Sequence, residues 1–215
     1  MAGLMDYREV RAELDKLKSK YLLLGNGFSI ALFPKIFTYE SLFEHADFSE
    51  APHLQDLFKV LGTMDFEIVI QKLVSAAGIL SIYAPDEKDL IATLQKDADF
   101  LKGVLVKAIA GRHPDRPMDI KPEQYAACRS FLQPFGHIFT LNYDVVLYWT
   151  LMQDEVDKID LRPDDGFREP EEENQPYVSW QDSQSASVNF LHGALHLFDA
   201  RSKSSNTLGQ GQTSL

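Results

Sequence analysis

The chain has 215 residues, of which 45% are hydrophobic and 25% charged, a composition typical of a globular protein with one large domain or two small ones. Its net charge of −11 argues against general nucleic-acid binding, because affinity for the phosphate backbone comes from clustered lysine and arginine. No apolar run approaches the roughly 20 residues that span a bilayer, so no membrane association is expected. The single cysteine, Cys128, excludes an internal disulfide and a four-cysteine zinc site and favours the reducing cytoplasm.

The first predicted elements lead into and out of a glycine turn. Apolar residues at three- and four-residue spacing predict an amphipathic helix over 5–19, and the apolar run 21–24 predicts a buried strand. Glycine permits a sharp turn and leaves no Cβ between the backbone and a ligand, and a short helix expected over 28–32 would offer free N–H groups to an anion. The turn itself reads Gly25-Asn26-Gly27-Phe28-Ser29.

This turn also has a purely structural interpretation. Ile30 stands where the full dinucleotide-binding fingerprint has its third glycine, so the spacing alone does not establish a phosphate site. Ser29 lacks the context of a nucleophile elbow and is interpreted as an anion-binding or capping hydroxyl.

A block of helices is expected between this strand and the next one. Asp65 is suited to cap the third of these helices, and Glu67 falls in its first turn; a contribution of Asp65-Phe66-Glu67 to the cleft is the less favoured alternative. The two longest are expected to form an antiparallel pair packed beside the sheet. The predicted helices cover residues 38–46, 53–61, 66–84, 86–110 and 123–132.

Two further strands are predicted in the C-terminal third of the chain. The apolar run 137–141 leads into Asn142-Tyr143-Asp144, and a helix is expected over 145–152. The run 188–191 ends at His192-Gly193, and 195–198 is a candidate fourth strand.

These elements predict an α/β fold, with a Rossmann-like parallel sheet and a helical insertion at about 38–132 between the first two motif-bearing strands. A single domain is expected over 1–200. Within it, the polar stretch 160–187 is expected to be a long surface loop, and 201–215 a disordered tail.

Polar residues follow all three predicted strands. Ligands bind outside the carboxyl ends of the strands in an open parallel sheet, so the three motifs are expected to converge on one cleft. Each motif keeps a local alternative: Asn142 and Asp144 are good helix caps, and His192 before a glycine suits a turn. His196 is interpreted as structural, and no metal site is assigned because no histidines or acids have ligand spacing.

Taken together, the three motifs resemble those of the sirtuin-like NAD-binding family, which carries Gly-Ala-Gly-x-Ser, Thr-Gln-Asn-Ile-Asp and Leu-His-Gly in that order. The forms with Asn26 and with Tyr143 look like a divergent bacterial branch whose members often act as NAD-cleaving effectors in anti-phage defence. The Asp-Phe-Glu start of the helical block, residues 65–67, is also similar to that branch. The matching segments are Gly25 to Ser29, Thr140 to Asp144 and Leu191 to Gly193.

The resemblance implies a role for each motif residue. Asn142 would orient the ribose and the attacking water, Asp144 would bind the nicotinamide amide, and His192 would be the general base. Phe28 would cover the nicotinamide side of the pocket, with a core role as the alternative. The diphosphate would lie against Gly25, Asn26, Gly27 and Ser29, and Thr140 and Tyr143 would complete the cofactor-binding set.

The expected function is therefore hydrolysis of NAD to nicotinamide and ADP-ribose, without a metal. The alternatives are a module that senses NAD or ADP-ribose without cleaving it, and an NAD-dependent protein deacylase or ADP-ribosyltransferase. One cysteine cannot build the zinc module of deacetylating sirtuins, and the chain ends soon after its third motif, before the strands that hold the adenosine half in that family. A homo-oligomer or a trigger protein is left open as a partner.

Overall fold

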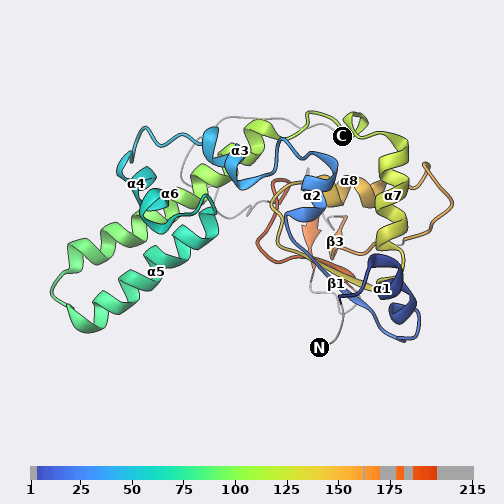
Figure 1. Ribbon diagram of the computed structural model, residues 1–215, viewed down its shortest axis with the longest axis horizontal. Coiled ribbons are helices and arrows are strands. Elements are labelled where there is room, and N and C mark those ends of the chain that lie inside the picture. The colour runs from blue at the N-terminus through green and yellow to red at the C-terminus, as the bar shows by residue number, and fades with distance from the viewer. Residues whose placement is uncertain (1–3, 162, 170–177, 182–185, 198–215) are drawn as a thin grey trace.

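A computed structural model describes residues 4–161, 163–169, 178–181 and 186–197, and it has a mixed α/β architecture (Figure 1). The tail predicted to be disordered, 201–215, lies outside these residues. The helices are α1 (Tyr7–Leu14), α2 (Gly27–Leu32), α3 (Tyr39–Glu44), α4 (His53–Leu61), α5 (Phe66–Tyr83), α6 (Lys88–Arg112), α7 (Pro122–Leu132) and α8 (Val146–Met152), with a 3-10 turn η1 (Pro117–Asp119). The strands are β1 (Tyr21–Leu24), β2 (His137–Thr140), β3 (Phe167–Arg168), β4 (Ser179–Trp180) and β5 (Val188–Phe190).

The three predicted motif-bearing strands form one parallel sheet in the order β1-β2-β5. Their last residues are in register, since Leu24 pairs with Thr140 and Thr140 with Phe190. The three strands therefore lie side by side, as expected, with their carboxyl ends at one edge of the sheet. The expectation that β1 is wholly buried was wrong, because Tyr21 and Leu23 remain exposed on one face of the sheet while Leu24 is buried.

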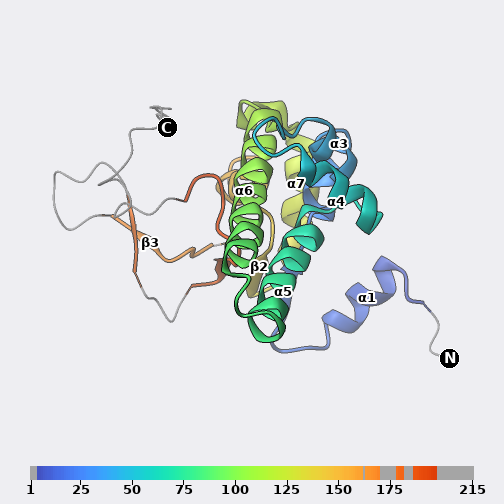
Figure 2. The ribbon, with the colours of Figure 1, turned by 90° about the vertical axis from the view of Figure 1, so that its left-hand side faces the viewer.

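The helical insertion lies between β1 and β2 and extends away from the sheet. Helices α5 and α6 pair as an antiparallel hairpin, at the left in Figure 1 and nearest the viewer in Figure 2. The prediction that this pair packs beside the sheet was wrong. The apolar faces of α5 and α6 instead pack against each other and against α3 and α4. The residues buried there include Leu54, Val69 and Leu101.

The molecule has a helical core and a smaller core at the sheet. The helical core gathers aromatic residues, among them Phe48, Phe58 and Phe66, whose rings contact one another. The sheet core contains Leu24, Ile138 and Val188 with residues of α7 and α8. Phe28 of α2 packs against both cores, which joins the insertion to the sheet.

Helix ends follow local signals in some places and tertiary packing in others. Asp65 caps α5 as predicted, accepting hydrogen bonds from the N–H groups of Glu67 and Ile68. Helix α6 continues through Gly111, where the sequence predicted a stop, because its last turns bury Ala108 and Ile109 in the helical core. Helix α1 buries no residue and ends at Leu14, short of the predicted boundary.

The C-terminal segment differs from the sequence prediction in two places. Within the expected surface loop, β3 and β4 pair as a short antiparallel ribbon, which stands away from the helices in Figure 2. The candidate fourth strand is wrong, since Leu195 and His196 lie in a turn closed by a hydrogen bond from the Leu197 N–H to the Ala194 carbonyl. Phe198 lies outside the described residues.

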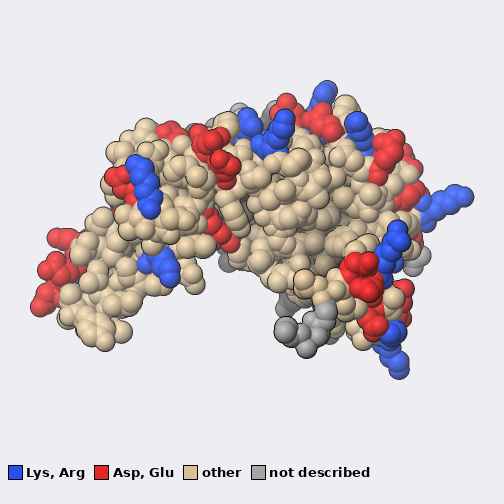
Figure 3. All heavy atoms as spheres, in the orientation of Figure 1, with Lys and Arg blue, Asp and Glu red and all other residues tan. Residues whose placement is uncertain are grey.

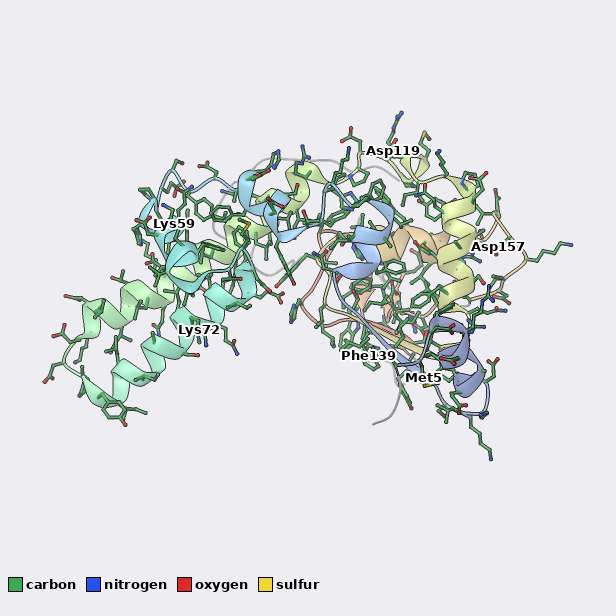
Figure 4. All side chains as sticks on the ribbon, in the orientation of Figure 1. Met5, Lys59, Lys72, Asp119, Phe139 and Asp157 are labelled. Atoms are coloured by element: carbon green, nitrogen blue, oxygen red, sulfur yellow. The ribbon has the colours of Figure 1, made fainter. Side chains whose placement is uncertain are left out.

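A buried arginine that the sequence did not single out ties α7 to the segment after α8. Arg129 is 1% exposed, and its Nε lies 3.1 Å from Oδ2 of Asp157, the residue labelled beside α7 in Figure 4. Its terminal nitrogens donate to the carbonyls of Thr150, Leu151 and Ile159. A buried charge is tolerated only when paired and hydrogen-bonded in this way, so Arg129 fixes the helix that follows the second motif.

The face that Figure 3 shows carries both basic and acidic side chains, scattered over a surface made mostly of other residues. Among the described helices, α5 has the length and mean hydropathy, 1.5 over 18 residues, that also suit a membrane span. Four of its apolar residues, Phe66, Val69, Leu73 and Ala77, are buried within the protein, an arrangement also found in core helices of soluble proteins.

Candidate functional site

A pocket opens at the carboxyl ends of β1 and β2, where the sheet meets the helical insertion. Its cavity volume is about 120 Å³, below the roughly 300–1,000 Å³ of typical small-molecule sites, so a larger ligand would extend out of its mouth. The sheet side contributes Gly25, Asn26, Leu141, Asn142, Tyr143 and Asp144. The insertion contributes apolar residues such as Phe37 and Leu105 together with the polar residues Tyr39, Asp65 and Glu67.

A hydrogen-bonded chain of three side chains connects the first two motifs. Nδ2 of Asn142 donates to Oγ of Ser29 at 3.0 Å, and the Ser29 hydroxyl donates to Oδ2 of Asp144 at 2.6 Å. An ionised Asp144 can only accept hydrogen bonds. The Ser29 hydroxyl must then donate to Asp144 and accept from the amide of Asn142, so the direction of both hydrogen bonds is fixed. This arrangement leaves Oδ1 of Asn142 as the amide atom for a ligand.

Asp144 is buried and bonds to the start of α8 as well as belonging to this chain. Its Oδ1 accepts the N–H of Val146, the first residue of α8, although the N-cap position itself is Val145. Asn142 caps no helix, and its own N–H donates to Oγ1 of Thr140. Burial raises the pKa of the Asp144 carboxyl, an effect that the hydrogen bond from Ser29 partly opposes.

The third motif contacts the helical insertion through its histidine. Nδ1 of His192 lies 3.2 Å from Oε1 of Glu67 in the first turn of α5, and its ring centre lies 5.7 Å from that of Tyr143. Both of those neighbours line the pocket, whereas His192 itself does not. Burial is the main cause that raises the pKa of Tyr143, and the charge of Glu67 raises it further.

The glycine turn is arranged differently from the sequence prediction. Neither Gly25 nor Gly27 has a positive φ, and a Cβ added at either would meet no atom within 4 Å, so the turn itself does not demand glycine. Gly25 nevertheless lines the pocket, and the space beside it is open. The side chain of Asn26 also lines it, while its Nδ2 donates to the carbonyl of Phe37.

Four of the predicted cofactor-binding residues do not lie on the pocket wall. Ser29 is fully buried and uses its hydroxyl within the chain of side chains described above. Phe28 packs between the two cores, in agreement with its alternative, structural interpretation. Gly27 and Thr140 are likewise outside the pocket wall, and Thr140 acts through the backbone of Asn142.

The sequence allows two roles for Asp65-Phe66-Glu67, a helix start, which it favours, and a contribution to the cleft. Both are borne out, because Asp65 caps α5 and all three residues line the pocket. No signal in the sequence pointed to Tyr39. Burial is the main cause that raises the pKa of its hydroxyl, and the nearby Asp65 raises it further. His113 contacts the backbone directly after the second motif, because its Nε2 accepts the N–H of Val145.

The described residues contain no cluster of histidine, cysteine, aspartate and glutamate suited to a metal ion. Compared with known families, residues 22–212 match a family model described as a domain of unknown function, DUF4917. No curated protein and no solved structure matches the chain.

Proposed function

The chain belongs to the DUF4917 family, a domain of unknown function, so its activity has to be argued from the cleft itself, and we propose that it cleaves the nicotinamide–ribose bond of NAD. In this proposal the parallel sheet is a Rossmann-like, sirtuin-like NAD site, and the products are nicotinamide and ADP-ribose. A defence effector is the cellular role that the resemblance favours.

The meeting of three polar motifs at the ends of adjacent parallel strands is the observation that carries the proposal. β1, β2 and β5 end in register, so the three motifs follow one edge of the sheet. Asn26 and Asn142 line the pocket there, and His192 contacts two other lining residues, Glu67 and Tyr143. A dinucleotide is expected at such an edge, where strands end and free backbone groups face a cleft. The net charge of −11 argues against a nucleic acid as the ligand, because affinity for its backbone needs clustered lysine and arginine.

The reaction places specific demands on the site. The C–N bond to nicotinamide breaks and its electron pair passes to the pyridinium nitrogen, which becomes neutral, so the leaving group needs no general acid. A water oxygen bonds to the ribose C1′ and releases a proton. The protein must therefore orient the ribose, stabilise a developing positive charge and accept one proton.

The described residues fit these demands with some changes from the sequence expectation. Oδ1 of Asn142 is the amide atom placed to accept a ribose hydroxyl or the attacking water, since Nδ2 is bonded to Ser29. Asp144 adds negative potential when ionised and holds the Asn142–Ser29 chain. The diphosphate contacts fall to Gly25 and Asn26, because Ser29 is buried.

His192 is the proposed base, because histidine exchanges protons near neutral pH. In the described part of the chain its Nε2 has no hydrogen-bond partner, so that nitrogen is the one that would take the proton from water.

The test is turnover of NAD by the purified protein, followed by chromatography of the products. Asn142→Ala and His192→Ala are each expected to lower turnover, His192→Ala by about 10²–10⁴-fold, which is the usual contribution of a general base. His53→Ala is the matched control, since His53 also pairs with a carboxylate, Asp97 at 2.9 Å, but lies on α4 outside the pocket. Full turnover in both site variants would remove the assignment.

A second function, a sensor that binds NAD or ADP-ribose without cleaving it, is favoured by one observation. His192 does not itself line the pocket, and the buried polar groups of Ser29 and Asp144 are already paired. Calorimetric titration separates the two proposals: binding that is lost in Asn142→Ala, with no nicotinamide released by the wild type, would establish the sensor.

A further inference from the structure

We infer that Glu67 is a positioning residue for His192, holding its Nδ1–H so that Nε2 is the nitrogen that takes the proton from water; this inference rests on the proposed function. The observation is the 3.2 Å contact between Oε1 of Glu67 and Nδ1 of His192. It joins the helical insertion to the third motif at the edge of the pocket, which Glu67 and Tyr143 both line.

The backbone of Glu67 is held firmly on both sides of the residue. Oδ1 of Asp65 accepts its N–H at 2.9 Å, and Phe66, which is 1% exposed, is anchored in the aromatic cluster with Phe48 and Phe58. The contact with His192 is therefore made by a carboxylate on a fixed helix start.

His192 is fixed from the opposite side. It follows β5 directly, and the N–H of Gly193 donates to the carbonyl of Phe190, which closes the turn around the histidine. The ring of Tyr143 covers one side of the imidazole. Two rigid elements thus meet at this pair, as a precisely placed catalytic group requires.

Stability does not explain the contact. The side chains of Glu67 and His192 are 46% and 37% exposed, and ion pairs with such exposure contribute about 0–1 kcal/mol. The first turn of α5 is already capped by Asp65, so Glu67 is not needed to begin the helix. The carboxylate of Glu67 faces Nδ1 of His192, and this proximity favours the tautomer that carries its hydrogen on Nδ1.

A carboxylate at Nδ1 gives the imidazole the orientation and tautomer of a base. Nδ1–H donates to Glu67, and the Nε2 lone pair remains to accept the proton that water loses when it attacks C1′. The imidazolium that forms is stabilised by the same carboxylate, and its proton then leaves to solvent. Ionisable groups near Glu67 include Tyr39, Asp65 and Tyr143, and the carboxylate paired with Nδ1 of His192 is that of Glu67, at 3.2 Å.

The test combines a spectroscopic readout with kinetics on Glu67→Gln. Nitrogen-15 NMR of the His192 ring is expected to show the Nδ1–H tautomer in the wild type and a shift toward the Nε2–H tautomer in the variant. The kcat is expected to fall about 10–100-fold, as for other groups that orient a histidine, with KM nearly unchanged. Glu123→Gln is the control, because Glu123 also lies in an exposed first turn, that of α7, away from the pocket.

A double-variant comparison shows whether Glu67 acts through His192. In the His192→Ala background, Glu67→Gln is expected to cause no further loss, because residues that act as a unit are not additive. Additive losses, or an unchanged His192 tautomer in Glu67→Gln, would overturn the inference. If the wild type releases no nicotinamide but the tautomer shifts as expected, the proposed function fails while the positioning contact is upheld.

Discussion

At the scale of single residues, the site depends on one buried carboxylate. Asp144 is 4% exposed and is held by the Ser29 hydroxyl and the Val146 N–H. Burial raises its pKa above the ordinary value of 3.8. The folded protein therefore binds a proton at Asp144 more readily than the unfolded chain does, and ionising this group costs stability.

This gives a pH-dependent prediction for Asp144→Asn, in which the amide oxygen still accepts the Val146 N–H. Below the unfolded pKa both states are protonated and Asp144 carries no penalty; the penalty grows as pH rises through the raised folded pKa. The unfolding free energy of the variant relative to the wild type is therefore expected to increase from about pH 4 to pH 7. Urea denaturation across this range measures it. A difference that is constant, or that falls with pH, would contradict the burial argument.

At the scale of an element, the turn after β5 determines where His192 lies. Gly193 has a φ of 76°, in the left-handed region that disfavours residues with a Cβ, although no atom would obstruct a methyl group there. Its N–H closes the turn onto Phe190. The requirement for glycine therefore comes from the backbone conformation alone, and it lies one residue after the proposed base.

Gly193→Ala is expected to lower the unfolding free energy by about 1–2 kcal/mol, the usual cost of a left-handed residue with a Cβ. It is also expected to lower NAD turnover, because relaxing the turn moves His192 away from Glu67. The control is Gly78→Ala in the middle of α5, where an added methyl has open space and is expected to stabilise the helix by about 0.5–1 kcal/mol. Equal stability changes in both variants, measured by urea denaturation, would rule out the strained turn.

At the scale of the whole molecule, the pocket lies where two cores meet. The helical core supplies Leu105 and Glu67 to its wall, and the sheet supplies Asn142. Phe28 packs against both cores from α2, just after the glycine turn. The relative position of the insertion and the sheet, and so the shape of the pocket, depends on this contact.

Phe28→Ala is expected to lower the unfolding free energy by about 2–4 kcal/mol, somewhat below the usual cost for a fully buried phenylalanine because Phe28 is only half-buried. Ligand binding in the pocket is expected to weaken as well, since the two walls lose their shared contact. Tyr83→Ala is the control, because Tyr83 is 84% exposed at the far end of α5. Thermal or urea unfolding measures both, and a similar small change in each would show that Phe28 does not join the cores.

Local signals in the sequence were sufficient to predict much of the fold. Strand 21–24 and helix 53–61 have the predicted bounds, and Asp65 caps α5 as expected. Periodicity, capping and glycine or proline breaks depend on neighbours a few residues away, which makes them readable from the chain alone. The polar motifs after three strands were readable for the same reason, and the parallel order of the strands brings them together.

Tertiary contacts decided what those motifs do. Ser29 and Asp144 are 115 positions apart, and only packing places the serine beneath the pocket, where it orients Asn142 instead of facing a diphosphate. The hairpin of α5 and α6 turns away from the sheet because α3 and α4 cover its apolar face, and this placement brings Glu67 to His192. Neither contact has a periodic or local signal, since each depends on how buried surfaces from distant segments fit together. The sequence alone therefore determined the elements and the three motifs, and the tertiary structure determined which atoms of those motifs remain available for chemistry.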